Sequence, residues 1–458
     1  MANLEGALAV TRFGLGAQRG EIDIASRGPK AWLEGQLKTP SDVLINDPAF
    51  KGLASSRDIF RVYQDYKDKR KIMREADKPA ASKAFSDLVK NNFYEEIQAR
   101  AVYAAGTRRP FHERLTRFWS NHFSISARNR TTRLWPGVYE REAIRPHILG
   151  RFSDLASKAI FHQGMLVFLD NVGSVGPRSR KGINADKGLN ENLAREVLEL
   201  HTVTLAADYT QADVTEFAKA LTGWTINGKA NYGAPIGTVT FRSFYHEPGR
   251  RTVLGQKYPK GLIVSEKQQA PQILKDLCAR PETAENIAVK LATHFVSDDP
   301  PQDLIKALKA RFLETEGDLT ALYKVLIHSP HAWTPAAQKV KSPEELLIST
   351  ARMIGVKNTF TARPRDTYDS LAQSPFTAPT PEGWPDKASA WIGPDAILKR
   401  IEWANKISSK IANIDAGDFL QSALGARVSV NTLQAVSRAE SVQQARILAL
   451  MSPEFQRR

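Results

Sequence analysis

The sequence predicts a mainly α-helical protein, built as one large multi-helix module with a single small β-hairpin around residues 236–256. Apolar side chains recur at helical spacing through most of the chain, as on the buried face of a helix. The segment IGTVTFRSF (236–244) alternates β-branched with other residues, which is typical of a strand, and TVLGQKY follows it after a Pro-Gly turn. Hydrophobic residues make up 42% of the 458 residues, enough for a large core.

We expect residues 1–458 to form one mostly helical domain. Within it, residues 57–85 are rich in charges of both signs, so we expect a solvated, mobile helix or insertion there. Thr210 with Asp213 forms a capping-box pattern, which places a helix start at Gln211. The other helices are expected, in chain order, in 85–123 with a break at Pro110, in 151–174, in 190–201, in 268–330 and after Pro343.

Composition excludes several classes of protein. The single cysteine, Cys278, excludes a disulfide framework or a zinc site made of several thiolates. The sequence contains no stretch of 18 uninterrupted apolar residues, so it predicts no membrane-spanning helix. The first residues lack the basic start and long apolar run of a secretory signal. We therefore expect a cytoplasmic protein, or a periplasmic or exported one if a leader has been removed.

The net charge of +15 is unevenly distributed. The segment from Arg108 to Arg151 holds ten arginines, no lysine and only three glutamates. Arginine binds carboxylate or phosphate through two parallel hydrogen bonds, so this segment suits an anionic ligand. Alternatively, its arginines form a solvated helix face or pair with acids elsewhere in the chain. On the first interpretation, the candidate substrate-binding residues here are Arg128, Arg130 and Arg133.

The stretch NENLAREVLELH (190–201) places polar groups where a helix should be apolar. With 100° of rotation per residue, Asn190 and His201 fall in the middle of the apolar arc. A buried polar group without a partner costs roughly 1–3 kcal/mol, so each needs a backbone carbonyl, a carboxylate or a metal ion. Two asparagines in the first turns exceed what capping requires, so Asn190 and Asn192 are also candidate substrate-binding residues.

The familiar catalytic motifs are missing, which leaves the histidines as the main candidates. His122, His201 and His246 would suffice as the ligands of a divalent metal ion, provided that the fold brings them together. Alternatively, each is a core histidine whose ring is hydrogen-bonded to a backbone carbonyl. The nearby carboxylates that are candidate catalytic groups are Glu196, Glu199 and Asp170.

Several longer blocks, taken together, resemble one bacterial family. They include RFGLG (12–16), FWSNHF (118–123), MLVFLDN (165–171), NENLAREVLELHT (190–202), YTQADVTEFAKALTGW (209–224), YHEPGRRTVLG (245–255), KLATHFVSDDPP (290–301), KSPEELLISTARMIG (341–355), PTPEGWPD (379–386) and SPEFQRR (452–458). The chain is similar over its full length to the domain-of-unknown-function family numbered eighteen hundred. The resemblance implies one mostly helical module without an assigned activity. It also implies a partner, a phosphatase- or sulfatase-like protein often encoded beside such chains.

Three functions follow from these patterns. The first is a metal- or histidine-dependent hydrolase of an anionic substrate, an acidic glycan or a phosphoester, in which a bound metal activates water and Glu196 or Glu199 acts as the base. The second is a non-enzymatic accessory protein for the phosphatase- or sulfatase-like partner. The third, nucleic-acid binding, rests only on the positive charge and lacks any supporting motif. Trp384 and Trp391, in the proline-rich loop 374–394, either stack on a sugar or anchor that loop to the core.

Overall fold

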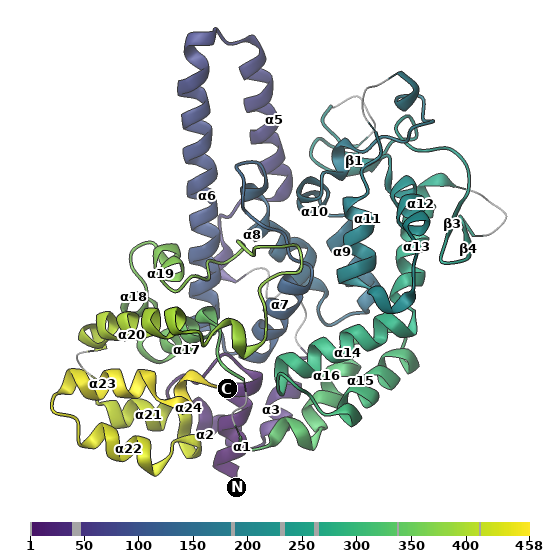
Figure 1. The fold of residues 1–458 in the computed structure, drawn as a ribbon. Helices are drawn as coiled ribbons and strands as arrows, with labels where there is room; N and C mark the ends of the chain where they lie inside the picture. The colour runs from purple at the N-terminus through teal and green to yellow at the C-terminus, as the bar shows by residue number, and fades with distance from the viewer. Residues whose placement is uncertain are drawn as a thin grey trace.

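A computed structural model describes residues 2–38, 47–184, 188–229, 234–260, 265–336, 339–411 and 414–458. The fold is mainly α-helical, as predicted, and the only sheets in the described part of the chain are two antiparallel pairs of short strands (Figure 1). No helix among these residues is long and apolar enough to cross a membrane. The first helices, which lie near the base of the view in Figure 1, are α1 (Ala2–Leu8), α2 (Glu21–Ser26) and α3 (Pro29–Gln36).

Helices α5 (Ser56–Ile72) and α6 (Lys78–Gly106) form a two-helix arm that projects from the body (Figure 1). Ser55 caps α5 through a reciprocal capping box with Asp58. The rings of Tyr66 and Phe85 stack across the arm with their centroids 4.1 Å apart. The charged segment 57–85 is therefore the outer part of this arm, in which both helices are exposed over most of their surface.

The middle of the chain forms a lobe beside the arm (Figure 1). Its helix α12 begins at Gln211 behind the capping box of Thr210 and Asp213, as predicted. The helices from α7 onward are α7 (Pro110–His122), α8 (Pro136–Tyr139), α9 (Phe152–Ile160), α10 (Gln163–Phe168), α11 (Asn192–Glu196), α12 (Gln211–Leu221) and α13 (Gln269–Cys278).

The sequence predicted one β-hairpin around residues 236–256, but the structure has two separate pairs of strands in this region. Strand β2 (Val239–Phe241) pairs with β1 (Trp224–Ile226), which directly follows α12 and was not predicted. Strand β3 (Arg251–Val253) pairs with β4 (Gln256–Tyr258) through a tight turn at Leu254 and Gly255, both with positive φ. A three-residue strand is too short to show an alternating pattern, so β1 leaves no periodic signal in the sequence.

The remaining helices build the lower part of the molecule (Figure 1). They are α14 (Pro281–Phe295), α15 (Gln302–Glu314), α16 (Leu319–His328), α17 (Pro343–Ile354), α18 (Val356–Thr359), α19 (Pro364–Ser370), α20 (Pro394–Ser408), α21 (Ala416–Leu424), α22 (Val430–Ser437), α23 (Val442–Met451) and α24 (Pro453–Gln456). The apolar cluster of α17–α24 also contains Leu15, Phe93 and Ile97. The C-terminal helices therefore share their core with the N-terminal half.

A buried network of arginines and glutamates joins α6, α7 and the segment 140–145, and it reaches the C-terminal half through Glu344 of α17. Arg145, with a fully buried side chain, pairs with Glu113 and, at 3.3 Å, with Glu140. Arg100 from α6 pairs with Glu140 at 2.9 Å. Arg117 from α7 pairs with Glu113 at 3.1 Å. Within the arginine-rich segment, internal pairing is thus the structural role of Arg117 and Arg145, the second of the two interpretations that the sequence left open.

We predict that Arg145→Met lowers the free energy of unfolding by about 3–5 kcal/mol, because it leaves buried carboxylates without their partner. Arg151→Met is the matched control: Arg151 is half-exposed and pairs with exposed Glu316, so its loss should be under about 1 kcal/mol. Urea unfolding of both variants at pH 7 measures the difference. Equal losses in the two variants would contradict a structural role for the buried network.

Candidate functional site

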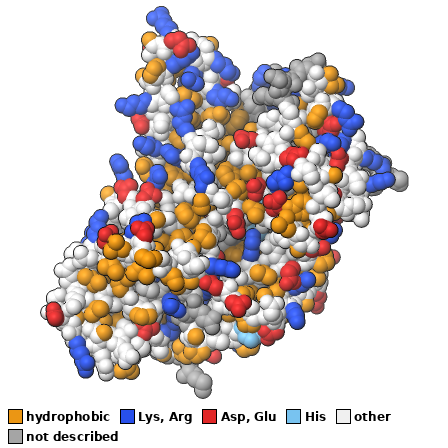
Figure 2. Space-filling model, viewed as in Figure 1, with side chains coloured by type: hydrophobic (Ala, Val, Ile, Leu, Met, Phe, Trp, Pro, Cys, Tyr) orange, Lys and Arg blue, Asp and Glu red, His pale blue; other side chains and the backbone are white. Residues whose placement is uncertain are grey.

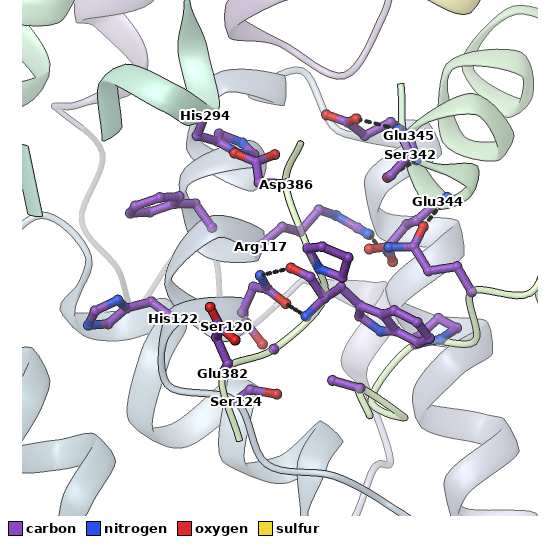
Figure 3. A pocket seen from close by; sticks show the side chains of 18 of the residues that line it. Arg117, Ser120, His122, Ser124, His294, Ser342, Glu344, Glu345, Glu382 and Asp386 are labelled. Atoms are coloured by element: carbon purple, nitrogen blue, oxygen red, sulfur yellow. Dashed lines mark hydrogen bonds and ion pairs between the residues drawn. The ribbon is translucent and has the colours of Figure 1, made fainter. Parts of the chain in front are cut away.

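A cavity of about 680 Å³ lies between helices α7, α14 and α17 and the loop 373–391. This volume is within the range of small-molecule sites. In Figure 3, His122 and Ser120 lie toward one end and Glu344 and Glu345 toward the other, with Arg117 between them. Apolar and aromatic side chains make up much of the wall: Leu15, Phe118, Ile125, Tyr139, Val289, Val340, Ile348, Phe376, Trp384 and Trp391.

The loop is fixed over the cavity by Asn121, at the end of α7. The Asn121 amide donates to the Trp384 carbonyl at 2.9 Å and accepts from the Trp384 backbone N–H at 2.8 Å. Gly383, next to Trp384, has φ +94°, and an added Cβ would lie 2.5 Å from the Asn121 carbonyl oxygen. Only glycine fits this close approach without strain. Trp391 is buried and donates to the Pro385 carbonyl at 3.0 Å, a hydrogen bond within the loop.

An oriented histidine–carboxylate pair lines the cavity. His294 Nδ1 lies 3.1 Å from Asp386 Oδ2, and Figure 3 shows the two side chains next to each other. Because an ionised carboxylate only accepts hydrogen bonds, Nδ1 carries the proton and Nε2 holds the lone pair of the neutral ring. His294 Nε2 is buried and has no hydrogen-bond partner among the described residues. Burial lowers the pKa of His294 although Asp386 opposes that shift, so the ring is neutral near pH 7.

Asp386 is held ionised by the hydrogen bond from His294 and by two nearby cations. Burial favours its protonated form, but His294, Arg458 and Lys339 together keep the pKa of Asp386 below its ordinary value. Arg458 Nη2 lies 3.6 Å from Asp386, and the same guanidinium donates to the His294 carbonyl. Lys339 Nζ donates to the Asp386 carbonyl and pairs with Asp298. The pair is therefore positioned by contacts from several segments.

Lys290, one helical turn before His294 on α14, also lines the cavity. Its Nζ donates to the Leu200 carbonyl at 3.1 Å and lies 3.3 Å from His122 Nδ1. His122 Nε2 lies 3.2 Å from the His201 carbonyl. A carbonyl only accepts, so the proton of neutral His122 is on Nε2 and Nδ1 accepts from the lysine.

Burial lowers the pKa of Lys290 to about 8, with Glu382 opposing the shift. Among the described residues, the contacts of Lys290 Nζ are with His122 and the Leu200 carbonyl and not with a carboxylate. At pH 7 the amine is therefore still mainly protonated and partly desolvated, with Glu382 of the cavity wall as a nearby opposite charge that does not form an ion pair with it. Such a cation suits the carboxylate, phosphate or sulfate group of a ligand.

The structure brings together only two of the three predicted metal ligands. The rings of His122 and His201 lie with centroids 5.7 Å apart. His246 lies apart from them against Phe241, with Nδ1 2.8 Å from the Thr222 carbonyl. The described residues contain no group of three or more His, Cys, Asp or Glu side chains placed to hold a metal ion. The expected three-histidine site is therefore not assembled, because His246 belongs to the β1–β2 region.

His201 is buried in a π-helical turn, Val197–His201, as its place on the apolar arc predicted. Neither ring nitrogen has a partner among the described residues, and burial lowers the pKa of His201 to about 3. Asn190 precedes the helix and accepts from the backbone N–H of Asn192 at 2.8 Å. Both asparagines therefore have a local role at the start of α11, and neither lines the cavity.

The predicted catalytic carboxylates also lie outside the cavity lining. Glu196 is half-buried, and burial together with Glu199 raises its pKa. Glu199 pairs with Arg195 at 3.6 Å. Asp170 is exposed in a left-handed conformation at the end of α10.

The three predicted substrate-binding arginines do not line the cavity either. Arg128 is exposed. Arg130 donates to Ser82 at 2.8 Å, and its guanidinium lies over the Tyr66 ring of the arm. Arg133 lies over Phe93. These contacts make Arg130 and Arg133 part of the junction between the arm and the body.

Sequence reasoning found His122 but missed Lys290, His294 and Asp386. A signal was present: Lys290 and His294 stand four residues apart in KLATHFV, the spacing that places two side chains on one helix face. Asp386 closes the block PTPEGWPD. Nothing in the sequence, however, shows that this loop lies against α14.

One family model matches residues 8–457, and its description is a protein of unknown function, DUF1800. The match spans nearly the whole chain, so the protein belongs to this family. No curated protein and no solved structure gives a significant match. The family therefore brings no assigned reaction to the cavity.

We predict that Lys290 titrates near pH 8, well below the ordinary lysine value of about 10.4. Competitive acetylation with acetic anhydride, followed residue by residue by mass spectrometry across pH 6–11, measures this titration. His122→Leu should lower the midpoint further, because it removes a hydrogen-bond acceptor from the ammonium form. The exposed-histidine variant His328→Leu is the control and should leave it unchanged. An ordinary midpoint in the unmodified chain would show that Lys290 is solvated.

Proposed function

We propose that this DUF1800 protein is a histidine-dependent hydrolase that acts on an anionic substrate in the cavity. The observation that carries the proposal is the His294–Asp386 pair, whose buried Nε2 lacks a partner among the described residues. A neutral imidazole oriented by an ionised carboxylate is the arrangement of a general base. The described residues bring no three metal ligands together, so the proposal rests on histidine rather than on the expected metal.

The chemistry follows from this geometry. Water attacks the acyl carbon or the phosphorus of a bound ester, and its proton passes to His294 Nε2. Asp386 stabilises the imidazolium that forms. The bond to the leaving oxygen then breaks, and the imidazolium returns the proton to that oxygen. The apolar wall excludes bulk water, which strengthens each of these electrostatic interactions.

Lys290 supplies the preference for an anion. Its ammonium group lies on the same helix as His294, one turn away, and its hydrogen-bond partners among the described residues are His122 and the Leu200 carbonyl, which leaves it without a paired carboxylate. A substrate carboxylate, phosphate or sulfate bound there would place a neighbouring ester bond within the same cavity. The arginines of the wall do not compete for this role, since Arg117 is engaged by Glu113 and Glu344.

We predict that His294→Gln reduces hydrolysis at least about a hundredfold, the contribution of a general base. The measurement is release of 4-nitrophenol from esters that carry a carboxylate, phosphate or sulfate, with neutral esters for comparison. His328→Gln is a matched control, because exposed His328 also pairs with a carboxylate, Glu34 at 2.6 Å, outside the cavity lining. Full activity in His294→Gln, or equal rates on neutral and anionic esters, would contradict the proposal.

The pH dependence should be bell-shaped. Activity falls as pH drops through the pKa of His294, which burial places below 6.5, because the base becomes protonated. It also falls as pH rises through the pKa of Lys290, about 8, because the cation that binds the substrate is lost. In Lys290→Met the alkaline limb should disappear and KM should rise, while the acid limb remains. A profile that His294→Gln leaves unchanged would show that the acid limb belongs to another group.

A second candidate function is the accessory role for a phosphatase- or sulfatase-like partner. Hydrophobic side chains gather on the surface over α20 (Figure 2), where Ile397, Leu398 and Ile401 are each more than two-fifths exposed. Exposed apolar patches commonly mark protein interfaces. This role does not involve His294, so the His294→Gln variant separates the two functions: an accessory protein would retain its partner and have no esterase activity to lose.

A further inference from the structure

A second cavity, a cleft of about 850 Å³, separates the arm from the lobe. Gln64, Asp68 and Lys71 of α5 form one wall, and the segment after α10 together with the β1–β2 region forms the other. Figure 1 shows α5 on the side of the arm that faces this lobe. The volume accommodates a short stretch of a flexible chain rather than a folded macromolecule.

The cleft carries a net positive charge. Three lysines and one arginine line it, and Asp68 is the single acid among the described lining residues: the cations are Lys71, Lys181, Lys229 and Arg242. Asp68 is already paired with Lys71 at 2.8 Å. Lys181, Lys229 and Arg242 all lie on the lobe wall, so a ligand in the cleft would meet positive charge on that side, opposite the neutral Lys71–Asp68 pair of α5. Low-dielectric walls concentrate such a field.

The remaining lining groups suit hydroxyl-rich rings. Ser174 and Thr225 supply hydroxyls, and Tyr245 supplies a half-buried aromatic ring. Gly223, with φ +87°, lets the β1 backbone pass close to β2, since an added Cβ would lie 2.8 Å from the Arg242 carbonyl oxygen. A charged sugar chain has groups that match these: its carboxylates would pair with the cations, its hydroxyls would hydrogen-bond to Ser174 and Thr225, and its apolar ring faces would pack on Tyr245.

Two other anionic partners fit less well. Single-stranded nucleic acid is bound through a series of aromatic side chains on which successive bases stack, and Tyr245 is the single aromatic among the described residues that line the cleft. A bilayer surface is flat and does not enter a recess. We propose that the cleft binds an acidic polysaccharide, whose carboxylate or sulfate groups pair with Lys181 and Lys229 of the lobe wall. This binding does not depend on hydrolysis in the first cavity.

The test measures binding of short galacturonate and sulfated galactan oligomers to the full chain by calorimetry at low salt, with neutral galactan as the comparison. We expect binding of an acidic oligomer that weakens with added salt, and no binding of the neutral one. Lys181→Glu with Lys229→Glu should reduce affinity at least tenfold. Lys306→Glu with Lys324→Glu, an equal charge change on exposed lysines of α15 and α16, is the matched control and should change affinity less than twofold.

Each other outcome overturns the proposal. Equal loss in the two double variants would show non-specific attraction to a basic protein. Tighter binding of single-stranded DNA, lost in the cleft variant, would identify a nucleic-acid site. No binding of either acidic oligomer would exclude the ligand class. His294→Gln should bind the oligomers as the unmodified chain does, so failure of the proposed hydrolysis and failure of this proposal give different results.

Discussion

The first turn of α17 holds the interaction on which the rest of the site depends. Ser342 caps this helix, and Glu344 and Glu345 follow Pro343 in the turn where negative charge is favoured. Glu344 accepts from Arg100 and Arg117, which come from α6 and α7. Glu345 accepts from Arg114 and forms an ion pair with Arg458 at 2.7 Å. Two adjacent carboxylates thus join the arm, α7 and the C-terminal segment at one point. Because buried charges without partners are unfavourable, none of these segments can shift alone.

This constraint also fixes the two sides of the cavity. Arg458, held by Glu345, contacts both Asp386 and the His294 carbonyl, so the carboxylate end of α17 positions the histidine pair on α14 and the loop. The loop is fastened a second time by Asn121 at the end of α7. The cavity wall is therefore polar and rigid where it contacts the network, and apolar elsewhere. A general base benefits from this arrangement, since its orientation is set before the substrate binds.

Features whose determinants lie within a few residues could be predicted from the sequence, whereas contacts between residues far apart in the chain could not. Periodicity and the Thr210–Asp213 capping box predict helices because their determinants lie within a few residues. The arginine-rich segment was recognisable, but whether its members bind a ligand or pair with acids elsewhere in the chain depended, for Arg117, on Glu344, 227 residues away. His122 was found because a histidine in an aromatic block stands out. His294 was missed because its significance depends on Asp386, 92 residues away. The β1 strand was missed because three residues show no period.

One hydrogen bond of His122, from Nε2 to the His201 carbonyl, determines which ring nitrogen is left to accept from another group. Its Nε2–H donates to the His201 carbonyl, so Nδ1 offers a lone pair. A metal ion would use that lone pair only with further ligands, and the described residues supply no such group. The lysine ammonium uses it instead, at 3.3 Å. Accepting from Lys290 stabilises the charged form of the lysine against the burial that lowers its pKa. The histidine that the sequence singled out as a ligand therefore acts on the charge of Lys290, the cation on which the proposed anion binding depends.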